Sequence, residues 1–504
     1  MTPRTTGICL LVFAALSAAF RLTGVVAPVF KVPFLGGDIL GGVLLALLVV
    51  FGLLLVLRTR NEWQFSPLVL KQIRRFRSLR RGYVSFMLLA VLAGVASLDN
   101  LVVGKRALVA KHNGQYYFPF LRGDFLPGKT FGFDSDAEVD YRELQQRDRE
   151  ENKGNWVLMP LVPYAPKLDS PPTIEVLEMR GEVLCLPGSS RPLDGAAYTV
   201  FASDEELKRQ EFQFRHGVRH GDFRGFNEKG EQIEKGRYEN GRRVAYTDYS
   251  EGRAAALEQM AQAGWRRLVY PPSGPSLLHK HYLGTNSTGQ DVLAMLFGGW
   301  QQVLIASVLF VVVVFSAGVI MGGTLGYFGG VVDMVGQRFI EIWSVLPFLL
   351  LVAIVSSLVS PTLSVLVLLI AAFGWMGATT YLRTAVYKEK ARDYVAAARL
   401  LGSSTPRIIF RQVLPNVIAI LVTLAPFEVS GVITSLAALD FLGFGLPPDE
   451  PSWGRLLHEG VDNFAYPWIV SSAFAAMAFV LVLVTFVGEA VREAFDPQKF
   501  TIYE

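Results

Sequence analysis

Long uninterrupted apolar runs recur along this chain of 504 residues and constrain its fold more than any other feature. Several runs are about 20 residues long, which is enough for an α-helix to cross the hydrocarbon core of a bilayer. The mean hydropathy of +0.35 and the 51% hydrophobic content exceed what soluble domains usually carry. A β-barrel would instead show short strands of alternating polarity. The sequence therefore predicts an all-α polytopic membrane protein.

We predict eight membrane spans, and the first of them is open to a second interpretation. Its apolar run is short and Arg21 interrupts it, so a signal peptide is an alternative to a retained helix. No clean cleavage signal follows, and we expect a retained helix whose Arg21 extends toward the interface. The eight spans cover about residues 7–29, 36–57, 82–99, 300–323, 339–358, 361–381, 416–436 and 468–487.

Lysine and arginine residues gather in two of the loops between the predicted spans. Residues 58–81 and 384–413 are strongly basic, whereas residues 437–467 contain only Arg455. Because basic loops stay on the cytoplasmic side, we expect both basic loops to be cytoplasmic. An even number of spans then places the N- and C-termini in the cytoplasm as well. Basic residues beside apolar runs report membrane topology, so we expect no nucleic-acid partner.

Residues 100–275, between the third and fourth spans, are polar and rich in turn-forming residues. We expect a mixed α/β insertion on the outer side of the membrane. The spaced glycines and aromatics of residues 217–242 favour short β-hairpins; they resemble MORN repeats weakly, and a small irregular β-subdomain is the alternative. Residues 252–265 predict one amphipathic helix. The chain is thus divided into residues 1–60, 61–99, 100–275 and 276–504.

Residues 123–130, GDFLPGKT, match the Walker A pattern letter for letter. A phosphate-binding loop needs a buried strand before it and a helix after it. The residues that follow, FGFDSD, do not predict a helix, and the segment lies in the outer insertion. We therefore expect no nucleotide site here.

Two pairs of closely spaced histidines raise the question of a metal site. His216 and His220 are four residues apart, and His279 and His281 are two apart, but no Cys/His cluster with zinc-site spacing accompanies them. We expect solvated loop histidines and no bound metal. Of the two cysteines, Cys9 lies in an apolar run and Cys185 in the polar insertion, which does not indicate a disulfide. No nucleophile–base motif stands out, so we do not expect an enzyme.

The polar, basic segment 383–415 carries a family signature. It places Ala397, Ala398 and Gly402 at the spacing of the EAA loop and closes with Val413, Leu414 and Pro415. This loop resembles that of the membrane subunits of ABC importers. HYLGTNSTGQDVLAMLFGG at 281–299, LDFLGFGLP at 439–447 and GEAVREAFDP at 488–497 lie in the order and spacing of the dipeptide/oligopeptide permease (DppC/OppC) family. YYFPFL at 116–121 resembles its YejE-type branch, which takes up oligopeptides and peptide-like antibiotics such as microcin C.

The resemblance implies a type I importer core of six helices, to which the first two spans and the outer insertion are additions. It implies a second homologous permease, two cytoplasmic ATPase subunits that bind ATP and Mg, and a periplasmic binding protein. This chain itself would hold no cofactor, hydrolyse nothing and lie in the bacterial inner membrane. Import of nickel, opines or glutathione by the same family is an alternative. Another is an envelope sensor that keeps the permease scaffold but no longer transports.

The EAA loop itself predicts a short helix from Asp393 to Leu401. Alanines are strong helix formers, and Gly402 permits a left-handed helix end. The resemblance implies that this loop couples the permease to its ATPases; a basic loop held near anionic lipid is the alternative. The Glu that names the motif is Ala396 here. The coupling residues expected are Asp393, Tyr394, Ala396, Ala397, Ala398, Arg399, Gly402, Leu414 and Pro415.

Two carboxylates, Glu341 and Glu428, fall within predicted spans. Intramembrane carboxylates rarely face lipid and often mark a translocation path, so both are candidates for lining one. Internal pairing is the alternative, for Glu341 with Arg338 one turn earlier. Pro347 and Pro426 are expected to kink their helices, and GGTLG at 322–326 to loosen a helix end.

Overall fold

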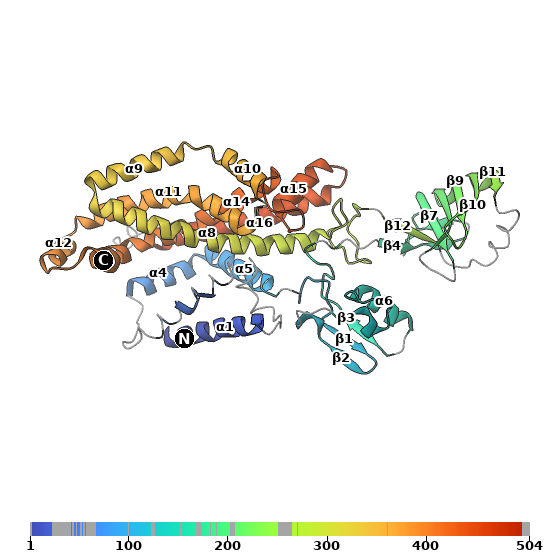
Figure 1. Ribbon diagram of the computed structural model, residues 1–504, viewed down its shortest axis with the longest axis horizontal. Coiled ribbons are helices and arrows are strands. Elements are labelled where there is room, and N and C mark those ends of the chain that lie inside the picture. Colours follow the sequence, from blue (N-terminus) through green and yellow to red (C-terminus); the bar gives the residue numbers. More distant parts are fainter. Residues whose placement is uncertain are drawn as a thin grey trace. The chain divides into compact units, whose positions relative to one another are not determined.

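The computed structural model describes most of the chain, which separates into two compact units (Figure 1). One unit comprises residues 1–169 and 274–504, and the other residues 170–273. The predicted span at 36–57 and the predicted helix at 252–265 lie outside the described residues, apart from isolated positions and Trp265. The described residues are 3–22, isolated positions between 42 and 56, 67–98, 100–121, 126–151, 154–167, 169, 173–181, 183–187, 189–201, 207–249, 265–269, 271–359 and 361–495.

The first unit is built from long apolar helices, and the described part of the chain contains between four and six candidate membrane spans. Two of the candidates are pairs of helices that bend sharply: α4 (Pro67–Ser78) with α5 (Arg80–Ala96) by 92°, and α9 (Gly330–Ser344) with α10 (Phe348–Leu358) by 68°. Helix α1 (Pro3–Leu22) has a shorter apolar stretch. The polytopic helical fold is confirmed. The four single candidates are α8 (Val292–Phe328), α11 (Leu363–Lys390), α14 (Leu414–Phe441) with the turns before it, and α16 (Pro467–Phe495).

The helices run well beyond the predicted spans because helical hydrogen bonding continues where the apolar sequence stops. At the start of α8 the carboxylate of Asp291 accepts a hydrogen bond from the Ala294 amide at 2.7 Å, which satisfies a free N–H of the first turn. Gly329, with φ +66°, ends the helix. The α9–α10 bend lies at Pro347, as predicted, since Pro347 precedes the first residue of α10.

Glycines at every fourth position of α8 bring this helix close to α11. A Cβ atom on Gly318 would lie 2.9 Å from Ala378 Cβ, and one on Gly326 would lie 2.5 Å from the Arg383 carbonyl oxygen. Small residues at this spacing let two helix backbones approach each other. The prediction that GGTLG loosens a helix end is therefore wrong: α8 continues to Phe328, and these glycines tighten its contact with α11.

The part of the polar insertion before residue 170 contributes a small α/β layer to the first unit. Strand β1 (Val109–His112) pairs with β2 (Gln115–Tyr117) and β3 (Trp156–Leu158), both antiparallel, and α6 (Tyr141–Glu151) packs with the sheet. The core of this layer includes Phe131 and Leu144. The C-terminal part of the Walker-like segment forms a single 3-10 turn, Gly128–Phe131, ended by Gly132, and Lys129 pairs with Asp136 at 2.8 Å.

The second unit is a seven-stranded sheet with a separate two-stranded hairpin. Strand β9 pairs antiparallel with β10, and β10 with β11, so the hairpins predicted for residues 217–242 are confirmed. Trp265 packs on Phe212 and Phe214 in its core, and Cys185 is a buried free thiol. The strand order is β11 (Arg242–Asp248), β10 (Gln232–Glu239), β9 (Val218–Phe226), β8 (Lys208–Arg215), β7 (Gly195–Val200), β12 (Arg266–Val269) and β4 (Thr173–Val176), with the hairpin formed by β5 (Glu178–Arg180) and β6 (Val183–Cys185).

Candidate functional site

The connection from α11 to α14 folds as its sequence predicts. Helix α12 (Asp393–Leu400) ends at Gly402, which adopts φ +72°. The Ser403 N–H donates to the Ala398 carbonyl at 3.1 Å and the Gly402 N–H to that of Arg399 at 3.0 Å, a Schellman end in which glycine is favoured. Two short turns, α13 (Thr405–Ile408) and the π-helical η4 (Ile409–Val413), then lead into α14, whose first residues are Leu414 and Pro415.

One face of α12 is anchored in an apolar cluster. Val395 and Ala398 are buried there against residues of α11 and of the turns before α14, among them Val386, Ile408 and Val413. The opposite face carries Asp393, Ala396 and Ala397, which are exposed. Of the predicted coupling residues, Ala398 is thus buried, whereas Asp393, Ala396 and Ala397 are exposed.

Tyr394 links α12 to both neighbouring helices through polar groups. Its hydroxyl donates to Glu389 Oε1 of α11 at 2.9 Å and accepts from Asn416 Nδ2 of α14 at 2.9 Å. Partial burial raises the pKa of Tyr394 above its ordinary value, so the hydroxyl remains protonated and available as a donor. The sequence had singled out Tyr394 but neither Glu389 nor Asn416, which lie outside the EAA motif.

Arg399 joins the other end of α12 to α8. Its Nε donates to the hydroxyl of Tyr327 at 3.3 Å, and its guanidinium lies 5.1 Å from the centre of that ring. Lys390 of α11 approaches the same ring, at 5.8 Å. A cation over an aromatic face is attracted by the ring quadrupole. Tyr327 was not among the residues that the sequence singled out.

The tip of α12 presents two unprotected leucines. Leu400 is 90% exposed and Leu401 is 86% exposed in this chain. Both side chains lie beside the turn at Gly402 and are almost fully exposed. They are therefore available to a partner and do not belong to the chain's own core. An apolar pair directly before Gly402 was the sequence signal that could have identified them.

The two carboxylates proposed for a translocation path lie away from α12. Glu341 on α9 forms an ion pair with Arg338, the internal pairing that was the alternative; both side chains are largely exposed, at 56% and 73%. Glu428 lies half-buried in α14, two residues after Pro426, which stands inside this helix.

The expectation of solvated histidines is wrong for His281. This side chain is only 2% exposed, its Nδ1 lies 2.8 Å from Asp291 Oδ2, and its ring stacks on Tyr164 at 4.1 Å. Asp291 also caps the first turn of α8, so His281 holds the capping side chain in place. His216, by contrast, is exposed. Across the part of the chain that the structure describes, no three His, Cys, Asp or Glu side chains are placed to share a metal ion.

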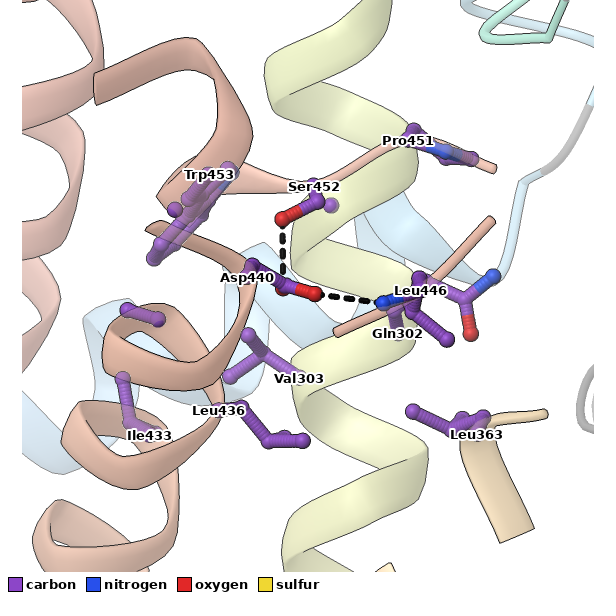
Figure 2. Close-up of a pocket in the computed structure, with 13 residues that line it drawn as sticks. Gln302, Val303, Leu363, Ile433, Leu436, Asp440, Leu446, Pro451, Ser452 and Trp453 are labelled. Carbon is purple, nitrogen blue, oxygen red and sulfur yellow. Dashed lines mark hydrogen bonds between the residues drawn. The ribbon is translucent and has the colours of Figure 1, made fainter. Parts of the chain in front are cut away.

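The C-terminal end of α14 contains a group of hydrogen-bonded residues around Asp440 (Figure 2). Asp440 Oδ1 accepts from the Leu446 amide at 2.7 Å, and Oδ2 accepts from the Ser452 hydroxyl. Ser452 in turn caps α15 (Trp453–Asp462). These residues border a cavity of about 20 Å³, which has room for about one water molecule and none for a peptide. Residues 439–447, LDFLGFGLP, and residues 451–454, PSWG, are thus joined through the two oxygens of Asp440.

Known proteins are similar to this chain over most of its length. The model of the family described as binding-protein-dependent transport system inner membrane component matches residues 315–500. The inner membrane ABC transporter permease protein YejE of Escherichia coli is 30% identical over 436 residues, 86% of this chain and 99% of that protein. The peptidoglycan transport system permease protein YejE of Agrobacterium fabrum is 29% identical over 444 residues, which are 88% of this chain and 96% of that protein.

A third relative matches only part of the chain. The oligopeptide transport system permease protein OppC of Mycobacterium tuberculosis is 35% identical over 233 residues, 46% of this chain and 78% of that protein. The resemblance expected from the EAA loop and the motifs around it is confirmed. The chain belongs to the family of binding-protein-dependent transport system inner membrane components and is a permease subunit of an ABC importer.

Proposed function

We propose that this subunit imports oligopeptides or peptide-like compounds that a periplasmic binding protein delivers. Two of the relatives, which cover 88% and 46% of the chain, are named as permease proteins of a peptidoglycan and of an oligopeptide transport system, and peptide chains are common to both kinds of compound. The cavity at Asp440 has room for about one water molecule and is not the path for such a substrate. We propose that the path forms between this subunit and a second, homologous permease.

The assembly we propose has two cytoplasmic ATPases below the two permeases, in the bacterial inner membrane. Those partners bind ATP with Mg and hydrolyse the ATP, and this subunit carries no cofactor or catalytic group. The basic loops at 58–81 and 384–413 support a cytoplasmic position for α12 and, with an even number of spans, for both termini.

Helix α12 is the part we assign to the ATPases, and the exposed Leu400 and Leu401 carry this assignment. A short helix buried on one side and bearing an apolar tip on the other is suited to a groove on a partner protein. Closure of the ATPases on ATP would displace α12, and with it α11 and α14, so that the pore switches between outward- and inward-facing states.

The charged face of α9 supports a place for Glu341 beside the translocation path or the second permease. Arg338 and Glu341 are exposed on a helix that belongs to a candidate span. Charged side chains at membrane depth turn toward protein or water rather than lipid. Glu428, half-buried in α14, is the second candidate, and the two positions are tested together by Glu341→Gln and Glu428→Gln.

The test of the proposed function compares one substitution on two exposed leucines. Leu401→Asp places a charge on the tip of α12, whereas Leu277→Asp places the same charge on a leucine that is 82% exposed in the turn before α8. We expect Leu401→Asp to lose co-purification of the ATPases and uptake of labelled tri- to octapeptides in the host, and Leu277→Asp to retain both. Equal behaviour of the two variants would refute the docking of α12.

A non-transporting envelope sensor remains the second candidate, because residues 170–273 form a unit of their own and Ala396 replaces the motif's glutamate. A sensor should neither co-purify with an ATPase nor stimulate ATP hydrolysis. Nickel, opine or glutathione import would retain the ATPases but leave peptide uptake unchanged in a deletion strain, and labelled nickel or glutathione would then be taken up instead.

A further inference from the structure

Glu389 stands at the point where three helices meet. It lies in the last turn of α11, and its Oε1 accepts hydrogen bonds from the Tyr394 hydroxyl of α12 at 2.9 Å and from Asn416 Nδ2 of α14 at 3.3 Å. The same Asn416 amide donates to the Tyr394 oxygen at 2.9 Å. The three groups form a closed triangle, so each side chain fixes the orientation of the other two.

The two carboxylate oxygens of Glu389 accept hydrogen bonds from different groups. Oε2 accepts from Arg392 Nε at 3.1 Å, but Arg392 is 59% exposed and only three residues away, and exposed ion pairs of this kind contribute little. Oε1 connects separate helices and belongs to a carboxylate that is largely buried. The acceptor at Oε1, rather than the charge, therefore makes the connection.

The sequence of α12 explains why an acid from α11 is needed. At the position that gives the EAA motif its glutamate this chain has Ala396, whose methyl group is exposed and cannot form a polar bond. Asp393, the acid upstream, is also exposed. Glu389 instead reaches α12 from the neighbouring helix.

We propose that Glu389 is a positioning residue that joins α12 to α11 and α14 through its Oε1, so that the three helices move as one body. This inference rests on the proposed docking of α12 to an ATPase. With the joint intact, displacement of α12 displaces both long helices; without it, the contacts described above that still hold α12 are its apolar face, Arg399 and the single hydrogen bond from Asn416 to Tyr394.

The test uses substitutions that separate shape, acceptor and charge. Glu389→Met keeps the length but removes the acceptor, Glu389→Gln keeps an acceptor oxygen but removes the charge, and Tyr394→Phe removes the donor. Hydrogen–deuterium exchange of the amides of residues 393–402 is measured in the purified transporter assembled with its ATPases and second permease. We expect exchange to rise roughly tenfold in Glu389→Met and Tyr394→Phe and to stay near wild type in Glu389→Gln.

Rescue by glutamine is the readout that distinguishes a positioning acceptor from a residue that merely fills space. Uptake should follow the same order: reduced in Glu389→Met while the ATPases still co-purify, and restored in Glu389→Gln. Glu489→Met, at an exposed carboxylate near the end of α16, serves as the matched control and should leave exchange at 393–402 unchanged. Wild-type exchange in both Glu389→Met and Tyr394→Phe, or equal loss in Glu389→Met and Glu389→Gln, overturns the proposal.

Failure of this inference is distinguishable from failure of the proposed docking. If Leu401→Asp releases the ATPases while Glu389→Met leaves α12 protected, the docking holds and the joint does not. If Leu401→Asp retains the ATPases, the docking itself is wrong, whatever Glu389 does.

Discussion

The two ends of α14 are held in different ways. At one end, Asp440 is enclosed by the loop that it organises, and its two oxygens accept from the Leu446 amide and the Ser452 hydroxyl. At the other end, the connection through α12 rests on one apolar face and a few polar contacts near solvent, while Leu400 and Leu401 are unprotected.

This difference teaches which end is built to move. A region with many buried contacts opens only at a cost close to that of unfolding, whereas a region with few buried contacts and exposed hydrogen bonds opens more cheaply. The Asp440 end therefore serves as the fixed point of α14 and the α12 end as its movable one. Four substitutions test this contrast in the purified subunit, from the largest expected loss of stability to the smallest.

Gly454→Ala should cause the largest loss. A Cβ atom here would overlap the Ala437 carbonyl oxygen and lie 2.7 Å from Asp440 Cβ, so α15 must shift away from α14. Overpacking of this kind costs about 3 kcal/mol, which thermal unfolding in detergent would report as a lower Tm. Gly431→Ala is the control, because among the described residues nothing lies within 4 Å of a Cβ at that position of α14. A similar Tm for both variants would show that the Asp440 end is not tightly packed.

Asp440→Ala should cost somewhat less, about 2 kcal/mol, because it leaves the Leu446 amide and the Ser452 hydroxyl without their acceptor. Asp440→Asn retains one oxygen for Leu446, and its amide can donate to Ser452. We expect the asparagine variant to lose less than half as much stability in the same measurement. Equal losses would mean that the charge, rather than the hydrogen-bonding pattern, holds the loop.

Gly402→Ala should have a smaller effect at the other end. No described atom lies within 4 Å of a Cβ at Gly402, so its cost comes only from φ +72° and amounts to about 1 kcal/mol. Asparagine tolerates this conformation better, and Gly402→Asn should recover most of the loss. Thermal melting of the purified subunit, followed by circular dichroism, ranks the Tm of wild type and the two variants. A collapse of the fold in Gly402→Ala would contradict a purely local role for this turn.

Leu400→Ser should leave the stability of the isolated subunit within about 0.5 kcal/mol of wild type, because the side chain makes almost no contact within the chain. The same variant should weaken co-purification of the ATPases. A measurable fall in Tm would show that Leu400 belongs to the subunit's own core and would weaken the contrast between the two ends.

The sequence predicted the movable end far better than the fixed one. Helix α12 and the left-handed Gly402 depend on local propensities, which short stretches of sequence carry. Apolar runs likewise located α8, α11, α14 and α16, although not their ends; the capping residue Asp291, for example, lies outside the run that located α8.

What the sequence missed depends on contacts between distant residues. Glu389 and Asn416 are 27 positions apart, and His281 is buried only because Tyr164, from the insertion, stacks on it. Gly322 was taken for a helix breaker because its close packing against α11 becomes visible only with the partner helix in place. Local rules describe chain conformation, but tertiary contacts decide burial and pairing.

Helix α8 touches both ends of this contrast. Trp453, beside the Asp440 loop, donates its indole N–H to the Leu296 carbonyl at 2.9 Å, and Arg399 of α12 contacts Tyr327. These two positions are separated by roughly 47 Å along one uninterrupted helix, at about 1.5 Å per residue. A continuous hydrogen-bonded rod bends slightly but does not shorten. Helix α8 thus keeps a fixed length. A displacement of Tyr327 along the helix axis must therefore appear at the other end as a tilt of α8 or as sliding of α8 against Trp453.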